Sequence, residues 1–145
     1  MDRNQFISVD WGTSNLRIRL ISMAERKVIE ELRFPKGIKA IYQEWTDSTQ
    51  EREEFYLRYL KSCLDQFQSE INQQVPLVIS GMASSSIGLR ELPYAQVPFG
   101  IKGKELHIEQ VNTNWFGHRV LLISGVQTSN DVIRGEEVQI IGLAE

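Results

Sequence analysis

The sequence predicts an α/β domain with a mixed five-stranded sheet, in which the first three strands are antiparallel and helices pack on the sheet faces. Two observations support this fold class. Three short strand-like segments follow one another within the first 34 residues, and two apolar strands come later, after longer segments that can cross over the sheet. A chain of 145 residues with 41% hydrophobic residues is also long enough to bury one core.

The first three predicted strands form a meander. Phe6–Asp10 is a short apolar run that ends at a carboxylate, and Leu16–Ile21 alternates apolar and basic residues, as a half-buried strand does. The segment between them, Trp11–Asn15, is short enough for a tight hairpin connection. Lys27–Phe34 alternates more weakly and is expected to be the third strand. Pro35–Asp47 has no clean period, so we expect an irregular connection there.

A long helix is predicted next. Ser48–Glu51 has the S-x-x-E form of a capping box, which satisfies free backbone N–H groups at a helix start. Apolar residues then recur at three- and four-residue spacing, which predicts one buried stripe. The stripe comprises Phe55, Leu60, Cys63, Leu64, Phe67 and Ile71.

The remaining strands are predicted in the second half of the chain. Pro76–Gly81 and Val120–Ile123 are apolar runs that lead to glycine, as buried central strands do. Glu105–Val111 is strand-like within a loop-rich stretch. Asn130–Asp131 can cap a final helix, Val132–Leu143. This order of elements is that of a ribonuclease-H-like domain.

Composition narrows the function classes. A net charge of -3 provides no bulk attraction to nucleic acid or to an anionic membrane. One cysteine and two histidines exclude an internal disulfide and argue against a histidine-based zinc centre. The sequence has neither a signal-peptide pattern nor an apolar run of roughly 20 residues. We therefore expect a cytoplasmic protein.

The turn after the first strand carries a candidate phosphate site. Asp10 ends a buried strand, where an unpaired charge would be costly. Gly12 lets the backbone turn closely, and Thr13, Ser14 and Asn15 add polar groups around the turn. Such a hairpin can hold phosphate oxygens while the aspartate holds a hydrated Mg²⁺. An ordinary polar β-turn uses the same residues, so that interpretation stays open.

Two further segments follow strand ends, where ligands bind in parallel sheets. Asp131 could accept the proton of a substrate hydroxyl that attacks a γ-phosphate, or it could be a plain helix cap. Arg134 could pair with a substrate anion or with a nearby glutamate. Ser80–Leu89 offers small residues and hydroxyls that suit a polyol, although a flexible serine loop has the same composition.

Together these segments resemble the 2-dehydro-3-deoxygalactonokinase family of the actin/hexokinase superfamily. The first segment is shared widely by sugar kinases and actin-like ATPases, whereas the last is distinctive. The resemblance implies that residues 1–145 form one N-terminal lobe of a two-lobed kinase and that the second, nucleotide-binding lobe is absent from the chain. The matching stretches are Asp10–Arg17, Gly81–Met82 with Gly88, Pro93–Tyr94 with Val97–Pro98, and Asp131–Gly142.

The resemblance also implies an activity and roles. The reaction would be ATP-dependent phosphorylation of 2-dehydro-3-deoxy-D-galactonate at its C6 hydroxyl. Asp10 would organise Mg²⁺, residues 12–15 with Arg17 would lie at the nucleotide phosphates, and Asp131 would be the catalytic base. The implied substrate contacts are Ser84, Ser85 and Arg134.

Three alternatives remain open. The chain could belong to a related kinase for another sugar or sugar acid. It could be an isolated, non-catalytic lobe that binds a sugar acid weakly or folds without any activity of its own. The apolar surface that such a lobe exposes could lead to self-association. A two-metal nuclease on the same fold would need three or four carboxylates and a basic patch. Besides Asp10, the helix after the third strand offers only Glu51, Glu53 and Glu54, at its solvated start.

Overall fold

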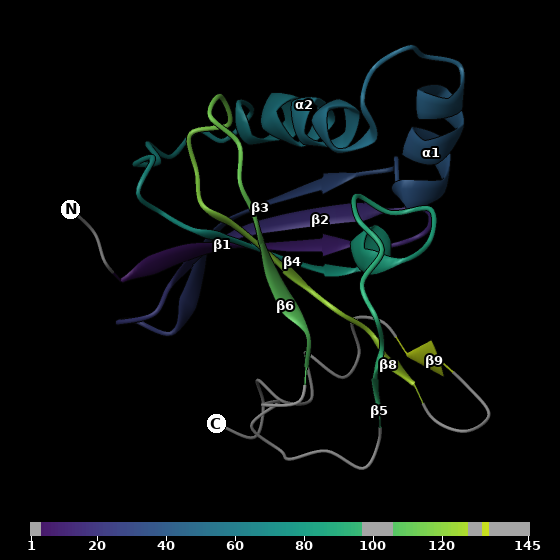
Figure 1. Cartoon of the computed structure of the whole chain (residues 1–145). Helices are drawn as coiled ribbons and strands as arrows, with labels where there is room; N and C mark the ends of the chain where they lie inside the picture. Colours follow the sequence, from purple (N-terminus) through teal and green to yellow (C-terminus); the bar gives the residue numbers. More distant parts are fainter. Residues whose placement is uncertain (1–3, 97–105, 128–131, 134–145) are drawn as a thin grey trace.

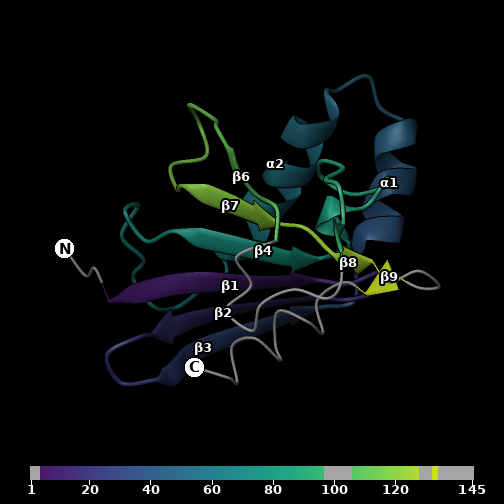
Figure 2. The same ribbon diagram turned by 60° about the horizontal axis from the view of Figure 1, so that its bottom comes forward.

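In the computed structural model, which describes residues 4–96, 106–127 and 132–133, a mixed sheet lies beneath two helices (Figure 1). The sheet has six strands in the order β3-β2-β1-β4-β7-β6, and this order can be followed across Figure 2. The predicted α/β class is confirmed. The strands are β1 Gln5–Trp11, β2 Leu16–Ser22, β3 Lys27–Phe34, β4 Leu77–Gly81, β6 Ile108–Val111 and β7 Val120–Ile123.

The strand directions match the predicted layout. β1, β2 and β3 pair antiparallel in succession, whereas β4 runs parallel to β1 and β7 runs parallel to β4. The predicted count of five strands was one too few. β6, from the strand-like stretch near residue 108, pairs antiparallel with β7 and provides partners for the backbone groups on that strand's outer side.

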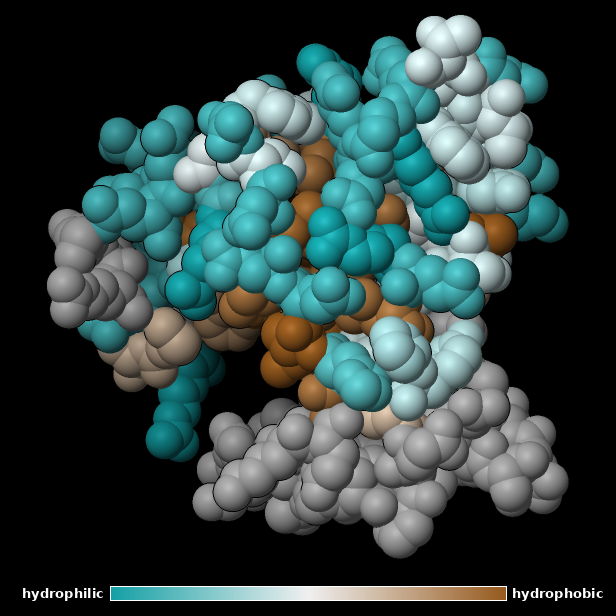
Figure 3. Space-filling view, in the orientation of Figure 1, coloured by the Kyte–Doolittle hydropathy of each residue, from teal (hydrophilic) through white to brown (hydrophobic). Residues whose placement is uncertain are grey.

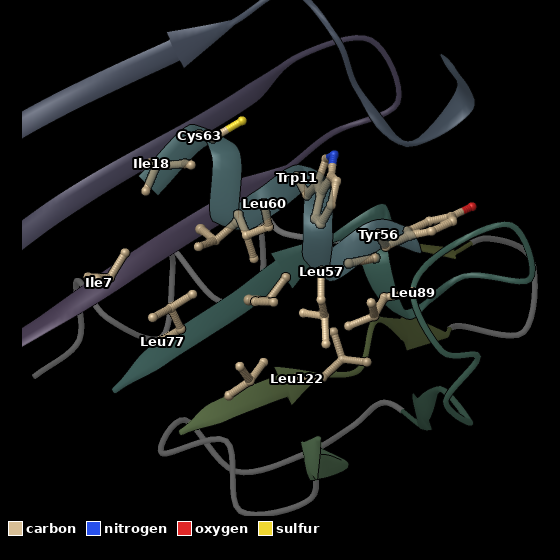
Figure 4. Close-up of a cluster of buried hydrophobic side chains, with 14 of the residues drawn as sticks. Ile7, Trp11, Ile18, Tyr56, Leu57, Leu60, Cys63, Leu77, Leu89 and Leu122 are labelled. Carbon is tan, nitrogen blue, oxygen red and sulfur yellow. The ribbon is translucent and has the colours of Figure 1, made fainter. Parts of the chain in front are cut away.

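The core lies between the sheet and the helices. Ile7, Val9 and Trp11 are fully buried on one face of β1, and the residues between them are half-buried on the other face. The Trp11 ring lies 6.0 Å from the ring of Tyr56 and 6.1 Å from that of Tyr59, measured between centroids. Figure 4 shows Ile7, Trp11 and Tyr56 within the cluster of buried side chains between the sheet and α2. β2, where the sequence predicted alternation, has the same pattern, with Leu16, Ile18 and Leu20 buried.

Polar side chains cover much of the face of the molecule that Figure 3 shows. The large hydrophobic residues that stay exposed include Val28 and Ile29 on β3 and Ile108 on β6, the two edge strands of the sheet.

A helix, α1, occupies Ile38–Thr46, where an irregular connection was predicted. Ile38 and Ile41 are buried one turn apart, and Tyr42 and Trp45 pack partly against the core. The start of α1 has no side-chain cap, because Gly37 holds the N-cap position. The usual capping signal is thus missing from the sequence at this point.

The predicted long helix is α2, Arg52–Leu64. Its N-cap is Glu51, whose carboxylate accepts from the backbone N–H groups of Glu53 and Glu54 at 3.2 and 3.0 Å. The predicted Ser48 cap was wrong, because the Ser48 hydroxyl donates to the Trp45 carbonyl at 2.8 Å and closes the end of α1 instead. Phe67 and Ile71, which were predicted to continue the buried stripe of this helix, lie beyond its end. Both side chains are partly buried and pack against the core.

A second, small sheet has the order β5-β8-β9, with β5 Ala95–Gln96, β8 Val126–Gln127 and β9 Val132–Ile133. The prediction that a helix begins at Val132 was wrong, because this residue pairs with Gln127 in a strand. A Val-Ile pair suits a strand, since both side chains are β-branched. In the described ranges no helix has the length and apolar character needed to cross a membrane.

Candidate functional site

The turn between β1 and β2 is a tight hairpin, as predicted. β1 ends at Trp11 and β2 begins at Leu16. The Gly12 N–H donates to the Asn15 carbonyl at 2.8 Å and closes the turn. The side chains of residues 13–15 are exposed, so their hydroxyl and amide groups are accessible to a ligand.

The start of α1 is attached to this hairpin. The Ile38 N–H donates to the Gly12 carbonyl at 2.9 Å, and the Lys39 N–H donates to the Thr13 carbonyl at 3.2 Å. Gly37 permits this contact, because a Cβ there would lie only 2.4 Å from the Thr13 oxygen and 2.5 Å from the Gly12 oxygen. The helix thus satisfies two of its unpaired N–H groups with the hairpin and holds the hairpin in place.

An open groove of about 800 Å³ lies beside the hairpin. Its walls come from the end of β1, the whole turn, the start of β2 and the end of β3. This places all the residues expected near the nucleotide phosphates around one groove. The lining residues are Asp10, Gly12, Thr13, Ser14, Asn15, Leu16, Arg17, Arg33, Phe34 and Pro35.

Asp10 forms a salt bridge with Arg17. We expected a partner for it, because an unpaired charge at the end of a buried strand would be costly. Asp10 lies opposite Arg17 in the β1–β2 register, and the Arg17 Nη2 is 3.0 Å from the Asp10 Oδ2. Both side chains are about one-third exposed (32% and 31%), on the half-buried face of the sheet. The carboxylate therefore faces the groove rather than the core, and a ligand can reach it.

The row of charges continues onto β3. Arg33 lies opposite Arg17 in the β2–β3 register, and its Nε is 2.5 Å from the Glu31 Oε1. Glu31 also accepts from the Arg19 Nε at 2.5 Å. Hydrogen bonds from Arg19 and then Arg33 hold the pKa of the Glu31 carboxyl below its ordinary value. Arg33 was not among the predicted residues, although its period-2 spacing on β3 places it on the same face as the basic residues of β2.

The residues at the groove fit a hydrated Mg²⁺ rather than a protein-caged metal. Across the described ranges, no group of three or more His, Cys, Asp or Glu side chains could hold a metal ion. Mg²⁺ usually keeps several waters and binds one or two carboxylates together with substrate phosphates. Asp10, beside the exposed hydroxyls of Thr13 and Ser14, provides such a partial site.

The loop after β4 lies next to the end of β1. Trp11 and Gly81 are register partners, and a Cβ on Gly81, whose φ is +95°, would lie 2.6 Å from the Trp11 oxygen. Ser84 and Ser85 are buried, with 1% and 3% of their surface exposed. The Ser85 hydroxyl donates to the Met82 carbonyl at 2.7 Å, whereas the Ser84 hydroxyl has no hydrogen-bond partner in the described structure.

The structure thus brings together Asp10, residues 12–15 and Arg17. The serine loop, residues 82–92, begins beside the end of β1 at Gly81, but Ser84 and Ser85 do not line the groove. The two other predicted site residues, Asp131 and Arg134, lie outside the described residues. Arg33 also lines the groove, because the pairing of β2 with β3 places it opposite Arg17. The sequence does not reveal this register directly.

Comparison with known proteins identifies the family of the chain. A family model described as 2-keto-3-deoxy-galactonokinase matches residues 10–145. The 2-dehydro-3-deoxygalactonokinase of Escherichia coli K12 is 29% identical over 95% of this chain and 42% of its own length. A Rhizobium meliloti protein with the same name, given provisionally, is 26% identical over 96% of this chain and 42% of its own length.

Solved structures support the fold. The crystal structure of a Sinorhizobium meliloti protein, provisionally assigned as a 2-dehydro-3-deoxygalactonokinase, superposes with a TM-score of 0.70 at 23% identity. The match covers 96% of this chain and 42% of that one. The chain therefore spans well under half the length of these relatives. Because the family model matches nearly the whole sequence, the chain belongs to the 2-keto-3-deoxy-galactonokinase family.

Proposed function

We propose that this chain forms the N-terminal lobe of a kinase that uses ATP and Mg²⁺ to phosphorylate 2-dehydro-3-deoxy-D-galactonate at its C6 hydroxyl. The observation that carries the proposal is the groove at the β1–β2 hairpin, where Asp10, Arg17 and the exposed turn lie together. Because the chain belongs to the 2-keto-3-deoxy-galactonokinase family, we infer that the phosphoryl acceptor is a sugar acid.

The groove residues would divide the work of phosphoryl transfer. Asp10 would hold Mg²⁺ through its carboxylate and bound water, while the hydroxyl and N–H groups of residues 12–15 would contact phosphate oxygens. When bound, the ion neutralises charge that develops on the transferred phosphoryl group. Arg17 already neutralises Asp10, and its remaining guanidinium donors suit a phosphate oxygen beside the same carboxylate.

The acceptor side of the reaction would involve the loops at the strand ends. Asp131 would take the proton from the C6 hydroxyl as that oxygen attacks the γ-phosphate. Arg134 would bind the carboxylate of the sugar acid. Ser84 and Ser85 would contribute hydroxyl groups, and the Ser84 hydroxyl, buried and without a partner, is available for a new hydrogen bond.

The rest of the active site would come from another lobe. The chain spans 42% of the length of its curated relatives, so residues 1–145 would supply the phosphate hairpin and the acceptor-side loops only. The adenosine pocket would belong to the second lobe. The same length difference favours one alternative, in which the isolated chain binds the sugar acid without turning it over.

Coupled measurement of ADP release tests the proposal. The chain is assayed alone and mixed with the remaining C-terminal part of the Escherichia coli relative, with ATP, Mg²⁺ and 2-dehydro-3-deoxy-D-galactonate, beside Asp131→Asn and Asp10→Asn variants. Asp65→Asn is the matched control, because Asp65 is an exposed C-cap residue remote from the groove. Turnover that requires the sugar acid, persists in the control and disappears in both variants would support the proposal.

The assay also separates the alternatives. Equal turnover with the C4 epimer of the substrate, or a preference for another sugar, would assign the site to a related kinase. Folded chain without turnover in both the isolated and the mixed assay, but with binding of the sugar acid in calorimetry, would identify a non-catalytic binding lobe. Turnover that survives in Asp131→Asn would reject that residue as the base.

A further inference from the structure

The loop after β4 is held by side chains of α2. The Arg52 Nε donates to the Gly88 carbonyl at 2.6 Å, and its Nη2 donates to the Ser86 carbonyl at 2.6 Å. The Tyr56 hydroxyl donates to the Ile87 carbonyl between them, also at 2.6 Å. Three successive carbonyl groups of the loop therefore accept hydrogen bonds from one turn of α2.

The same loop folds tightly onto the segment that carries Ser84 and Ser85. The Gly88 N–H donates to the Ser85 carbonyl at 2.9 Å, and the Leu92 N–H donates to the Ser84 carbonyl at 3.0 Å. A Cβ on Gly88 would lie 2.2 Å from the Ala83 oxygen, so the two halves of the loop touch through their backbones. Any shift of residues 86–88 would therefore move the two serines.

Arg52 also connects this loop to the hairpin. Its guanidinium group lies over the rings of Tyr42 and Trp45 of α1, at 5.9 and 5.6 Å from their centroids. α1 in turn is bonded to the hairpin carbonyls through its first N–H groups. A continuous series of contacts thus runs from the phosphate hairpin through α1 and Arg52 to the serine loop.

We propose that Arg52 is a positioning residue that fixes the Ser84–Gly88 loop relative to the phosphate hairpin. It acts through the carbonyls of Ser86 and Gly88, and its role toward the acceptor rests on the proposed function. The planar guanidinium can donate to two carbonyls while it stacks on aromatic rings. A lysine ammonium group cannot reproduce this geometry, so lysine does not replace arginine here.

A second attachment keeps the loop on the protein when Arg52 is changed. The Arg90 Nε and Nη2 donate to the two carboxylate oxygens of Glu53 at 2.5 and 3.0 Å. Hydrogen bonds to this carboxylate raise the pKa of Arg90, so the pair stays charged. Removal of Arg52 is therefore expected to loosen residues 86–88 without detaching the whole loop.

Amide hydrogen exchange on the full chain tests the positioning. The wild type is compared with Arg52→Lys and Arg52→Ala, and with Arg58→Ala as the matched control, since Arg58 is an exposed arginine of α2 that pairs with Glu54. The loss of two hydrogen bonds predicts exchange roughly tenfold faster at the Gly88 and Leu92 amides in both Arg52 variants. Unchanged exchange in β1 and β4 would exclude general unfolding.

Ligand affinities separate positioning from a general structural role. A residue that only stabilises the fold would affect the binding of both ligands, whereas a positioning residue of the loop affects only the sugar acid. In calorimetry, Arg52→Lys should weaken binding of 2-dehydro-3-deoxy-D-galactonate roughly tenfold and leave the affinity for Mg²⁺-pyrophosphate at the hairpin unchanged. Equal weakening of both ligands, or wild-type exchange at the loop amides in Arg52→Ala, would overturn the inference. If wild-type chain binds pyrophosphate but not the sugar acid, the proposed acceptor fails, and faster loop exchange alone then supports Arg52 as the positioning residue.

Discussion

Replacement of Gly37 by alanine is expected to damage the contact between α1 and the β1–β2 hairpin. At this position φ is -95° and ψ is -167°, which alanine adopts readily, so any cost is steric rather than torsional. An added Cβ would lie 2.4 and 2.5 Å from the carbonyl oxygens of Thr13 and Gly12. An ordinary contact begins near 3.4 Å, so the helix start and the hairpin must separate by about 1 Å.

That separation would break two hydrogen bonds. The bonds from the N–H groups of Ile38 and Lys39 are 2.9 and 3.2 Å long, and neither survives a lengthening of this size. Each contributes about 0.5–1.5 kcal/mol, and overpacking of a tight site costs about 1–3 kcal/mol. Lower entropy of the unfolded chain returns about 0.4–1 kcal/mol. We therefore expect a loss of about 1–6 kcal/mol, centred near 3 kcal/mol, in the free energy of unfolding.

Urea denaturation followed by circular dichroism measures this loss. The midpoint should fall while the slope stays constant, since the change affects the folded state. Gly117→Ala is the matched control. Its φ is +92°, and its Cβ would meet only the Gln73 side chain, at 3.5 Å, so about 1–2 kcal/mol of backbone strain is its only cost. A loss below about 0.5 kcal/mol for Gly37→Ala would refute the steric reasoning.

Three further predictions address the groove, the pH dependence and the loop. Asp10→Asn should weaken Mg²⁺-pyrophosphate binding at least tenfold in calorimetry, because it removes the carboxylate that would hold the ion, whereas Asp65→Asn should have no effect. The pKa of Glu30 is lowered, first by the backbone N–H of Gln68 and then by the Ser69 hydroxyl. Its contribution to stability is therefore present above the ordinary value of 4.5 and is lost as the pH falls through the lower folded-state pKa. Glu30→Gln should flatten the fall of the urea midpoint in this range, and an unchanged profile would contradict the assignment. Burial raises the pKa of Tyr56 to about 12, so its hydroxyl stays a donor up to about pH 11. Tyr56→Phe should cost about 1 kcal/mol in urea titrations and speed amide exchange at the serine loop, and exchange at the wild-type rate would exclude the hydrogen bond to the loop.

Local patterns were sufficient for the first half of the sheet. Alternation in residues 16–21, and the short polar turn before them, identified two strands and their hairpin, because period and turn chemistry are properties of neighbouring residues. The hairpin also contained most of the groove residues, so Asp10 and the turn could be found without coordinates.

The errors arose where distant contacts determine local structure. α1 was missed because Gly37 replaces the usual cap, and its role is apparent only when the hairpin carbonyls lie against it. Ser48 looked like the cap of α2, yet its hydroxyl bonds to the end of α1. The strand at Val132 and the sixth strand of the main sheet depend on partners elsewhere in the chain.

The sequence by itself determined the α/β class, the meander, the β1–β2 hairpin and the resemblance to a sugar-acid kinase family. Each of these depends on residue types at short spacing, which local sterics and hydrogen bonding translate directly into structure. Only the tertiary structure decided that Arg17 pairs with Asp10, that Arg33 lines the same groove, and that Arg52 joins the serine loop to the hairpin. These contacts depend on strand register and helix packing, through which residues far apart in the chain come within hydrogen-bond distance.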